Sequence, residues 1–404
     1  MKCPTNYFDH VTLHAVANAT KTLSVLYVID SLAGGGAEQS LIDVVSDLDL
    51  CHVRLEVVTL LPDDGLLTAD LLALGAGHQS LAELGRLRQF RWLRQQVSAG
   101  TYDLVHSTLL RADILSRLAC LGRPITLVTT LPNDSYSREH RKGSKYGSLA
   151  VRLVQSLEIL TAWRVDSFHA VSSTIADTMT KRLKIKRSKI EVIWRGRDAV
   201  RLGRRSPERG RLTRERLGLD PRAPLVLCVG RQDFQKGLDV AIRAHALVRQ
   251  KCPTATLLLV GRPGNATKQL RALLDSGLGA GVIELGHRSD VPDLMCASNV
   301  LCFPSRWEGL GGTLIEAMAL QLPIVASRIT PITETVGEGV ARLVEPDSAE
   351  ELAAELLREL GGATTSSGTD EGRRRFETFF SSQGAAQHMA ALYHRASGAT
   401  ASVR

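Results

Sequence analysis

The sequence is poor in aromatic residues and has no long apolar segment. Phenylalanine, tryptophan and tyrosine make up 4% of the 404 residues, and no basic stretch is interleaved with aromatic residues. Proteins that hold single-stranded nucleic acid combine a basic groove with stacking aromatics, so nucleic acid is disfavoured as a partner. No apolar run approaches the roughly 20 residues that span a bilayer, which argues against a membrane-embedded protein.

Cysteine is also scarce. The seven cysteines are scattered along the chain, odd in number, and form no CxxC pair. This distribution favours a reducing cytoplasm over a disulfide framework and argues against a zinc site. Residues 1–20 have no apolar core of the kind found in secretory signals, and their lack of periodicity indicates a disordered N-terminus.

What is present is typical of a globular protein with an anionic partner. Hydrophobic residues make up 44% and charged residues 23% of the sequence, and the net charge is +8. A chain of this length accommodates two domains of ordinary size. The basic excess is compatible with a phosphorylated substrate or an anionic membrane surface.

Short apolar runs alternate with amphipathic segments in two series. The first series is 23–30, 54–61, 102–107, 125–130, 167–172 and 189–194; the second is 224–231, 255–262, 282–286, 300–305, 323–327 and 341–346. This alternation predicts an α/β fold with two doubly wound, Rossmann-like parallel-sheet domains.

The domain boundaries follow from composition. The stretch 195–223 is rich in arginine and glycine and has no strand pattern, so we expect an N-terminal domain over 21–200 and a C-terminal domain over 201–380. Residues 361–372 are typical of a flexible connection. The segment 381–404 is predicted to form a helix that packs back on the N-terminal domain.

The most informative segment is PSRWEGLGGTLIEAMALQLPIVAS, residues 304–327. Gly311 and Gly312 open a short helix, whose free N–H groups and dipole favour an anion such as phosphate. Glu316 lies about one turn into that helix, where an acidic side chain reaches sugar hydroxyls, and Glu308 lies on the rim before it. The alternative is a glycine turn followed by a surface glutamate.

Two cations lie in a second segment, VGRQDFQKG. Arg231 follows the end of a strand and Lys236 precedes the next helix, an arrangement that suits a diphosphate. The alternative is two solvated cations on a loop. Both segments leave the same predicted sheet at its carboxyl edge, where α/β folds bind ligands, and this favours the diphosphate interpretation.

Two weaker motifs lie near the N-terminus. Residues 34–40, GGGAEQS, are a weak phosphate-loop signal, and the alternative is a turn that needs glycine. Asp47 and Asp49 have the spacing of a metal-binding pair, but they end an amphipathic helix. Because Arg231, Lys236 and a helix dipole can stabilise a diphosphate, no metal or other cofactor is expected.

Taken together and in this order, these segments resemble the retaining glycosyltransferases of family 4, also called group 1. The resemblance covers about residues 21–396 and is most specific over 282–335. It implies the GT-B architecture, in which two Rossmann-like domains face each other across a cleft.

The resemblance also implies roles for individual residues. Glu308 and His106 match catalytic positions of the family, Glu308 near the donor sugar and His106 on the fourth-strand position. Arg231 and Lys236 match its donor-diphosphate pair, and Glu316 the glutamate that holds the ribose. The remaining donor-binding matches are Gly35, Gly36, His287, Arg288, Leu310, Gly311 and Gly312.

The sequence departs from the family pattern mostly in the N-terminal domain. Leu131 stands where many members have a histidine, Ser107 and Thr108 follow His106, and residues 195–198 read Arg-Gly-Arg-Asp. These departures put the sugar and the acceptor in doubt more than donor binding. For His106 itself, a buried histidine with satisfied hydrogen bonds is the alternative.

The function implied is transfer of a sugar from a UDP- or GDP-linked donor to a glycan or lipid-linked acceptor, with retention of configuration. Envelope polysaccharide synthesis in the cytoplasm, peripheral to the inner face of the membrane, fits the basic segments 138–145 and 181–187. The alternatives are a nucleotide-sugar epimerase, a phosphorylase, or a donor-binding scaffold without turnover.

Overall fold

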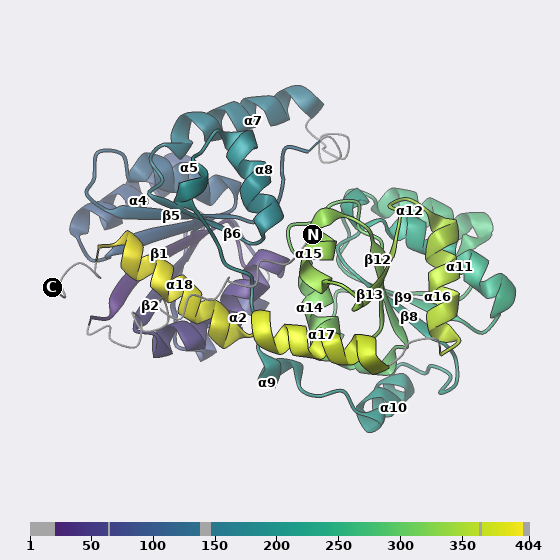
Figure 1. Cartoon of the computed structure of the whole chain (residues 1–404). Helices are drawn as coiled ribbons and strands as arrows, with labels where there is room; N and C mark the ends of the chain where they lie inside the picture. The colour runs from purple at the N-terminus through teal and green to yellow at the C-terminus, as the bar shows by residue number, and fades with distance from the viewer. Residues whose placement is uncertain (1–20, 64, 138–146, 363–365, 399–404) are drawn as a thin grey trace. The chain divides into compact units, whose positions relative to one another are not determined.

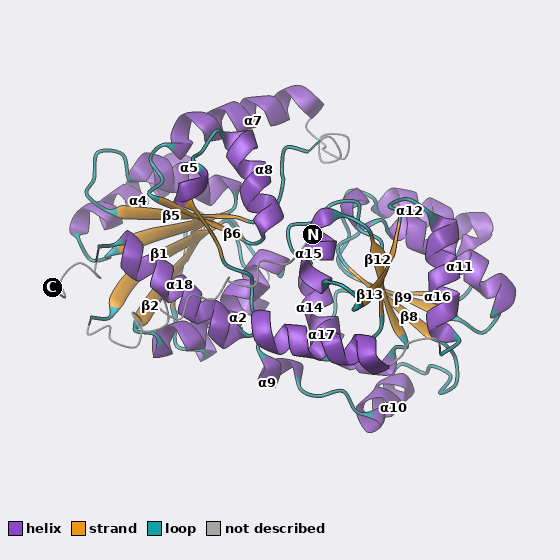
Figure 2. Cartoon of the chain, viewed as in Figure 1, coloured by secondary structure: helices purple, strands orange, loops and turns teal. Residues whose placement is uncertain are grey.

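The computed structural model describes residues 21–63, 65–137, 147–362 and 366–398. Two compact units make up the chain (Figures 1 and 2): the described parts of 1–134, 152–198 and 380–404 form the first, and those of 135–151 and 199–379 form the second. The predictions for residues 1–20 and for the basic residues of 138–145 lie outside the described residues.

The first unit is built on a seven-stranded parallel sheet with the order β3-β2-β1-β4-β5-β6-β7. The strands are β1 (Leu23–Ile29), β2 (Val53–Thr59), β3 (Gly77–Ser80), β4 (Leu104–Thr108), β5 (Thr126–Leu131), β6 (Ser167–Ala170) and β7 (Ile190–Val192). The strand order reverses between β1 and β4, which places the ligand-binding edge of such a sheet at the ends of these two strands.

Helices cover both faces of this sheet, because right-handed crossovers put them on one face when the chain moves one way and on the other when it returns. One face carries α2 (Gly36–Leu50), α3 (Leu66–Ala73) and α18 (Ser382–Ala396). The other carries α4 (Arg86–Ala99), α5 (Leu110–Ala119), residues 152–162 of α7 (Gly147–Ala162) and α8 (Ser173–Leu183) (Figure 2). A 3₁₀ turn, η1 (Arg187–Lys189), precedes β7.

Helix α18 is part of the core of the first unit, although it lies at the end of the sequence. It packs against α2, and its buried Ala386, Ala390, Leu392 and Tyr393 share one apolar cluster with strands β1 and β2. Backbone hydrogen bonds also connect the start of α18 to the segment after β7. The Arg197 N–H donates to the Phe380 carbonyl (2.8 Å), and the Ser382 N–H donates to the Arg197 carbonyl (3.1 Å). The core of this unit is therefore assembled from both ends of the chain.

The second unit is built on a six-stranded parallel sheet with the order β10-β9-β8-β11-β12-β13. The strands are β8 (Leu225–Val229), β9 (Thr256–Val260), β10 (Val282–Gly286), β11 (Val300–Phe303), β12 (Ile324–Ser327) and β13 (Ala341–Val344). The order again reverses, here between β8 and β11, so the loops after these two strands lie side by side at the carboxyl edge.

The helices of the second unit alternate with its strands. They are α9 (Ala199–Leu202), α10 (Pro207–Arg216), η2 (Phe234–Lys236), α11 (Leu238–Lys251), α12 (Thr267–Leu273), η3 (Leu274–Leu278), α13 (Val291–Ala297), α14 (Gly312–Ala319), α15 (Thr330–Val336), α16 (Ala349–Leu360) and α17 (Ser366–Phe379). Its main apolar cluster joins α11 and α16 to strands of the sheet.

The sequence predicts the fold class correctly: both sheets are parallel and doubly wound. Two local predictions need correction. Strand β3 was missed, because Gly77–Ser80 is a short, polar edge strand without the apolar run of the others. Residues 366–372 were predicted as a flexible connection, but they begin α17, where Gly372 lets the helix lie close to Val340 and Met318.

Candidate active site

The loops after β8 and β11 meet at the carboxyl edge of the second sheet. Gly237, at the end of the first loop, has φ 63°, and a Cβ there would lie 2.1 Å from the carbonyl oxygen of Pro304. Only glycine permits this backbone and this approach. The packing brings Lys236, just before Gly237, next to the loop that carries Glu308.

Arg306 holds the two loops together. Its backbone N–H donates to the Gln235 carbonyl (2.8 Å), and its guanidinium donates to the Phe234 carbonyl (2.7 Å). The same guanidinium lies over the Phe234 ring and binds both carboxylate oxygens of Asp239 (3.0 and 2.8 Å). Gln235 completes the junction by donating to the Trp307 carbonyl (2.8 Å). The relative position of the loops is thus fixed by polar contacts that do not involve Lys236 or Glu308.

Lys236 and Glu308 form an ion pair, with 2.5 Å between Lys236 Nζ and Glu308 Oε1. The same carboxylate oxygen accepts from the Ser305 hydroxyl (2.9 Å). The Glu308 side chain is only 7% exposed and that of Lys236 is 23% exposed. An ammonium has three N–H donors, so Lys236 can keep Glu308 and still donate to an anion from the open side.

Helix α14 begins beside this pair. Gly311 caps it with φ 85° and ψ 69°, and no side chain caps its amino end. A Cβ at Gly311 would lie 2.8 Å from Leu314 Cδ1, which adds to the reasons for glycine. The Thr335 hydroxyl donates to the Leu310 carbonyl (2.6 Å) and fixes the preceding peptide. The first N–H groups of α14 therefore form a positive helix end at the position that the sequence predicts.

Glu316 lies on the same face of α14 as Gly312, since residues four apart share a helix face. Its side chain is half-buried. Four predicted donor residues of this helix and its cap, namely Leu310, Gly311, Gly312 and Glu316, thus occupy one short segment next to the Lys236–Glu308 pair.

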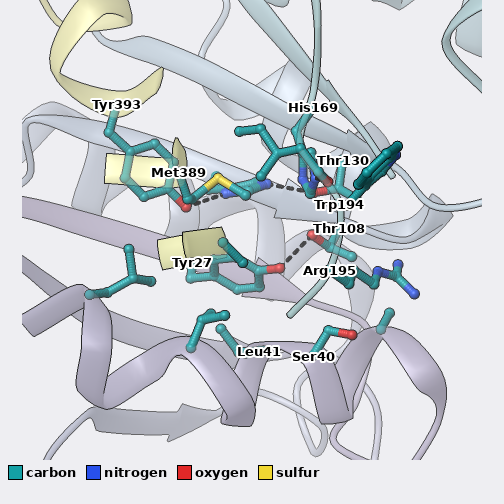
Figure 3. A pocket seen from close by; sticks show the side chains of 16 residues that line it. Tyr27, Ser40, Leu41, Thr108, Thr130, His169, Trp194, Arg195, Met389 and Tyr393 are labelled. Atoms are coloured by element: carbon teal, nitrogen blue, oxygen red, sulfur yellow. Dashed lines mark hydrogen bonds between the residues drawn. The ribbon is translucent and has the colours of Figure 1, made fainter. Parts of the chain in front are cut away.

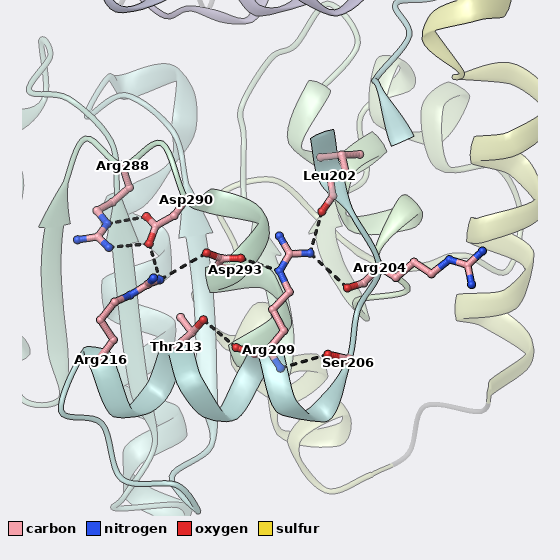
Figure 4. Close-up of polar contacts among 9 residues, drawn as sticks. All are labelled: Leu202, Arg204, Ser206, Arg209, Thr213, Arg216, Arg288, Asp290 and Asp293. Carbon is pink, nitrogen blue, oxygen red and sulfur yellow. Dashed lines mark hydrogen bonds and ion pairs between the residues drawn. The ribbon is translucent and has the colours of Figure 1, made fainter. Parts of the chain in front are cut away.

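The other predicted donor residues of the second unit are less closely tied to this pair. Arg231 is exposed and ion-paired with Asp233. His287 is exposed in the loop after β10. Figure 4 shows Arg288 and Arg216 pointing at the same carboxylate: Arg288 donates twice to Asp290 (2.8 and 2.7 Å) and Arg216 once (2.7 Å). Arg288 therefore belongs to an ionic cluster with α10.

The first unit contains a small cavity of about 50 Å³ near the carboxyl edge of its sheet (Figure 3). Tyr27, His106, Thr130 and His169 line it from four neighbouring strands, and Met389 and Tyr393 line it from α18. Tyr27 bonds Thr108 through their hydroxyls (2.8 Å), and burial raises the pKa of Tyr27 to about 12. The Tyr27 hydroxyl on the wall of this cavity therefore keeps its proton near neutral pH.

His106 has both ring nitrogens occupied. Nδ1 lies 2.5 Å from the Tyr393 hydroxyl, and Nε2 lies 2.7 Å from Thr130 Oγ1. The Thr130 hydroxyl is also hydrogen-bonded to His169 Nδ1 (3.1 Å). The other ring nitrogen of His169, Nε2, lies 2.8 Å from the Ile193 carbonyl. The alternative for His106, a buried histidine with satisfied hydrogen bonds, describes these contacts. Its catalytic role stays a prediction.

The direction of this hydrogen-bond chain follows from its end. A carbonyl only accepts, so His169 Nε2 donates to Ile193 and His169 Nδ1 accepts from Thr130. Thr130 then accepts from His106 Nε2, and His106 Nδ1 accepts from Tyr393. Burial lowers the pKa of His169 to about 4 and that of His106 well below its usual value, so both rings are neutral at pH 7.

The remaining predicted residues of the first unit lie at the start of α2 and the end of β5. Gly35 caps α2, and a Cβ on it would lie 2.4 Å from Glu38 Oε2; a Cβ on Gly36 would lie 3.8 Å from Arg195 Nη1. Leu131 is buried at the end of β5. The donor-loop role of Gly35 and Gly36 stays a prediction.

Sequence reasoning missed three residues that position others: Arg306, Thr335 and Tyr393. Arg306 and Thr335 lie inside segments that resemble the family, but their effect depends on contacts with distant loops. Tyr393 lies 287 residues from His106, and no spacing signal relates the two.

Two kinds of feature are absent from the part of the chain that the structure describes. No group of three or more His, Cys, Asp or Glu side chains in it could hold a metal ion. None of its helices is long and apolar enough to cross a bilayer. Its six cysteines are all free thiols.

Comparison with known families gives two adjoining matches. Residues 34–201 match the family described as Glycosyltransferase Family 4, and residues 223–361 match Glycosyl transferases group 1. Between them the two matches cover most of the chain, and residues 202–222, which separate them, follow directly after the boundary between the two units.

Two curated relatives illustrate the similarity. The chain is 29% identical over 274 residues to a 2-deoxystreptamine N-acetyl-D-glucosaminyltransferase of Streptomyces fradiae, which covers 65% of this chain and 63% of the relative. It is 29% identical over 234 residues to the UDP-Gal:alpha-D-GlcNAc-diphosphoundecaprenol alpha-1,3-galactosyltransferase of Escherichia coli, covering 56% and 58%. The chain thus spans about three fifths of the length of these relatives.

The fold also matches solved structures. The Anabaena protein HepE, crystallised in complex with UDP-glucose, superimposes with a TM-score of 0.77 at 24% identity, over 91% of this chain and 98% of HepE. At this identity the likeness concerns the fold.

Proposed function

Because the chain belongs to the family 4, group 1 glycosyltransferases and has their two Rossmann-like units, we propose that it is a retaining glycosyltransferase. It moves a sugar from a nucleotide sugar to a glycan or lipid-linked acceptor and keeps the anomeric configuration. The observation that carries this proposal is the Lys236–Glu308 pair beside the open amino end of α14.

The difficult step is the departure of the nucleoside diphosphate, because negative charge builds up on the leaving oxygen. Lys236, Arg231 and the N–H groups at the start of α14 are the groups that stabilise this charge. Arg306 and the close approach at Gly237 hold the loops that carry these groups in position before the substrate binds. Stabilisation by preorganised groups needs no reorganisation during the reaction, and this is why the rigidity of the two loops matters.

The two glutamates take different parts in this proposal. Glu316, one turn into α14, binds the ribose hydroxyls of the nucleotide. Glu308, held by Lys236 and Ser305, contacts the transferred sugar near its reacting carbon. The departing diphosphate takes the proton of the acceptor hydroxyl on the face that it leaves, so the product keeps the configuration of the donor.

The nucleotide in this proposal is UDP or GDP, with UDP favoured. The structure of HepE contains UDP-glucose, and the name of the E. coli relative specifies UDP-Gal as donor and a diphosphoundecaprenol-linked sugar as acceptor. These names support a UDP-sugar and a lipid-linked acceptor for this chain. A lipid-linked acceptor in turn supports envelope polysaccharide synthesis in the cytoplasm, at the inner face of the membrane.

The test has two stages. Melting temperature is first measured with UDP-, GDP- and ADP-sugars, because a ligand above its dissociation constant stabilises the folded state. The donor that binds is then incubated with lipid-linked and soluble acceptors, and the anomeric configuration of the product is read by NMR. We expect a UDP-sugar to raise the melting temperature and the product to keep the donor configuration.

Four outcomes would overturn the proposal. A product of inverted configuration would exclude the retaining mechanism. Conversion of the donor sugar without any acceptor would indicate an epimerase, and release of a sugar phosphate with inorganic phosphate as acceptor would indicate a phosphorylase. Donor binding with no turnover on any acceptor would indicate a donor-binding scaffold.

A further inference from the structure

We propose that the outer face of α7 is the surface by which this protein docks on an anionic membrane. Four residues form this α7 stripe: Leu153, Leu157, Leu160 and, directly after the helix, Trp163. Their exposed fractions are 64%, 44%, 70% and 69%. A single exposed leucine on a protein surface is ordinary, but a contiguous row of them marks an interaction site.

The stripe follows the helical period. Its members are spaced four, three and three residues apart, so they share one side of the helix. The opposite side packs on the first unit, where Glu158 is buried and ion-paired with Arg117 (3.2 Å). Helix α7 is thus anchored by its inner side, and the leucines of the stripe lie on the opposite, exposed side.

The exposed charges on and near α7 are mainly basic, since the nearby acids Asp166 and Asp177 are ion-paired with Arg164 and Arg187. Among the exposed residues of 149–163, Arg152 is the only charged one, and Glu158, the only acidic residue of α7, is buried. The basic segment 181–187 contacts α7 on the side away from the stripe, where Gln155 donates to the Arg182 carbonyl (2.9 Å). Lys181, Lys184 and Lys186 of that segment are exposed. The apolar row therefore lies on a helix whose surroundings are mainly basic.

This combination fits an anionic lipid surface better than a second copy of the chain. In a twofold dimer the stripe would meet its own copy, and the two basic segments would be brought toward each other. Such like-charge contacts oppose association. A leaflet with anionic headgroups instead attracts the lysines, while its acyl region takes up leucines and its headgroup region takes up tryptophan.

The mode of binding follows from the length and polarity of α7. The helix has 16 residues and carries Arg152 and Glu158, and no described helix can span a bilayer. An amphipathic helix of this kind lies in the plane of the interface with its apolar side among the lipids.

The inference deepens the proposed function, on which it rests for the biological reason to bind a membrane. It stands on the first unit alone and makes no use of the donor site. Failure of the two can therefore be told apart by measuring lipid binding and nucleotide-sugar binding on the same samples.

The first experiment measures co-sedimentation of the full chain with vesicles of 30% phosphatidylglycerol in phosphatidylcholine, and with pure phosphatidylcholine. The variant Leu153→Gln/Leu160→Gln removes half of the stripe. Its matched control, Leu50→Gln/Leu66→Gln, removes two leucines of similar exposure (78% and 58%) on the other helix layer. We expect the stripe variant to bind anionic vesicles at least about tenfold more weakly, and the control to bind like the parent protein.

The second experiment separates the charge from the apolar contribution. Lys181→Gln/Lys186→Gln should weaken binding at about 0.05 M salt and matter little at about 0.5 M, where the Debye length falls below about 5 Å. Lys251→Gln/Lys268→Gln, two exposed lysines of the second unit, is the matched control. Trp163 gives an independent readout: its emission should shift to the blue with vesicles, and Trp163→Phe should abolish that shift.

Several results would overturn the inference. Equal binding of the stripe variant and the parent, or equal losses in the variant and its control, would show that α7 does not contact lipid. A concentration-dependent dimer that the stripe variant abolishes would assign the surface to a second copy. If lipid binding behaves as expected but no nucleotide sugar binds, the proposed function fails and the docking surface stands.

Discussion

The carboxyl edges of the two sheets use side chains in opposite ways. In the second unit, Lys236 and Glu308 carry opposite charges, and Lys236 keeps part of its surface open. In the first unit, His106, Thr130, His169 and Tyr393 are neutral and fully enclosed, and every ring nitrogen of the two histidines has a partner. Both arrangements lie on the same kind of fold, so the architecture alone does not determine what an edge does.

The difference shows what each edge is suited for. A charged pair that is only partly buried keeps the strength to bind an anion, because its ammonium still has donors to offer. A neutral chain of hydrogen bonds is most valuable when water is excluded, and it fixes shape rather than charge. We therefore expect the second edge to govern donor chemistry and the first to govern stability and the form of the acceptor side. The predictions below test that division.

The largest effect is expected at Glu308. Glu308→Gln keeps the size of the side chain and removes the charge that the proposed function assigns to the contact with the reacting sugar. Loss of one transition-state contact of this type costs about 100-fold or more in kcat. Steady-state kinetics should show this loss, while calorimetric affinity for the free nucleoside diphosphate stays nearly unchanged. Glu345→Gln, an exposed acid of the same unit, should leave both values as they are.

Glu316 provides the contrast to this result. Glu316→Ala should weaken binding of the free nucleoside diphosphate as well, because the ribose is present in that ligand. If Glu308 and Glu316 variants change nucleotide affinity equally, the division of roles between the two glutamates is wrong.

The next largest effect is expected at Lys236. Lys236→Ala removes a charged hydrogen-bond donor to the diphosphate, which costs about 1.5–3 kcal/mol. Donor affinity should fall by about 10-fold to 100-fold. Arg231→Ala should have a smaller effect, because Arg231 is exposed and already paired with Asp233. Calorimetric titration with the nucleoside diphosphate measures both affinities. An unchanged affinity in the Lys236 variant would show that the Lys236–Glu308 pair, on which the proposed function rests, does not bind the donor.

A smaller effect, on stability alone, is expected at Tyr393. Tyr393→Phe leaves Nδ1 of the buried His106 without a donor, which costs about 1–3 kcal/mol. The urea midpoint should fall, and donor affinity should not change. Tyr102→Phe, a half-buried tyrosine elsewhere in the first unit, should be nearly neutral. A normal midpoint with a large loss of kcat would instead favour a catalytic role for the His106 chain.

The pH dependence of the first edge is subtler. His169 is neutral in the folded state because burial lowers its pKa to about 4, whereas the unfolded chain takes up a proton near pH 6.5. Its contribution to stability is complete above about pH 6.5 and is lost as the pH falls toward 4. Between pH 7 and 5.5, the stability advantage of the parent protein over His169→Gln should shrink by about 1 kcal/mol.

Asp113 is a control of opposite sign in the same unit. Burial raises its pKa to about 8, so the folded state holds a proton that the unfolded state has released. The parent protein should therefore gain stability relative to Asp113→Asn as the pH falls from 7 to 5.5. Urea unfolding at the two pH values measures both differences. Changes of the same sign for the two variants would contradict the assigned protonation states.

The smallest effect is expected from metal removal. In the proposed function, Lys236, Arg231 and the start of α14 supply positive charge to the diphosphate, and we therefore expect donor binding to change by less than about twofold in EDTA. Thermal shift with the nucleotide sugar, with and without EDTA followed by Mg²⁺, measures this. If the nucleotide sugar raises the melting temperature only when Mg²⁺ is present, a metal ion supplies part of the positive charge that binds the diphosphate.

Much of the fold was predictable because buried parallel strands leave a plain signature. Runs such as 23–30 and 224–231 are apolar on both faces and need no knowledge of their neighbours. Strand β3 has no such run, since it lies at the sheet edge, and α17 follows a sequence rich in small polar residues and acquires its place through packing on α14. Elements defined by their neighbours are those that the sequence does not reveal.

The candidate site divides in the same way. Glu308, Gly311 and Glu316 lie within nine residues of one another, so local spacing is enough to group them. The contact of Lys236 with Glu308 spans 72 residues and depends on Arg306 and Gly237, whose importance is visible only in three dimensions. At His106, a catalytic histidine and a buried histidine with satisfied hydrogen bonds look the same in the sequence. Only the hydrogen-bond partners in the structure can distinguish the two interpretations.

The position of α18 has a consequence for the order of events during synthesis. The second unit is made almost entirely from residues 199–379, so it can close as soon as they leave the ribosome. The first unit, although it begins earlier, waits for Tyr393 and the alanines of α18 to fill its core. Until then the face of α2 that α18 covers is exposed, and such apolar surface is what chaperones recognise. The unit whose sequence is translated first is thus the one that completes its fold last.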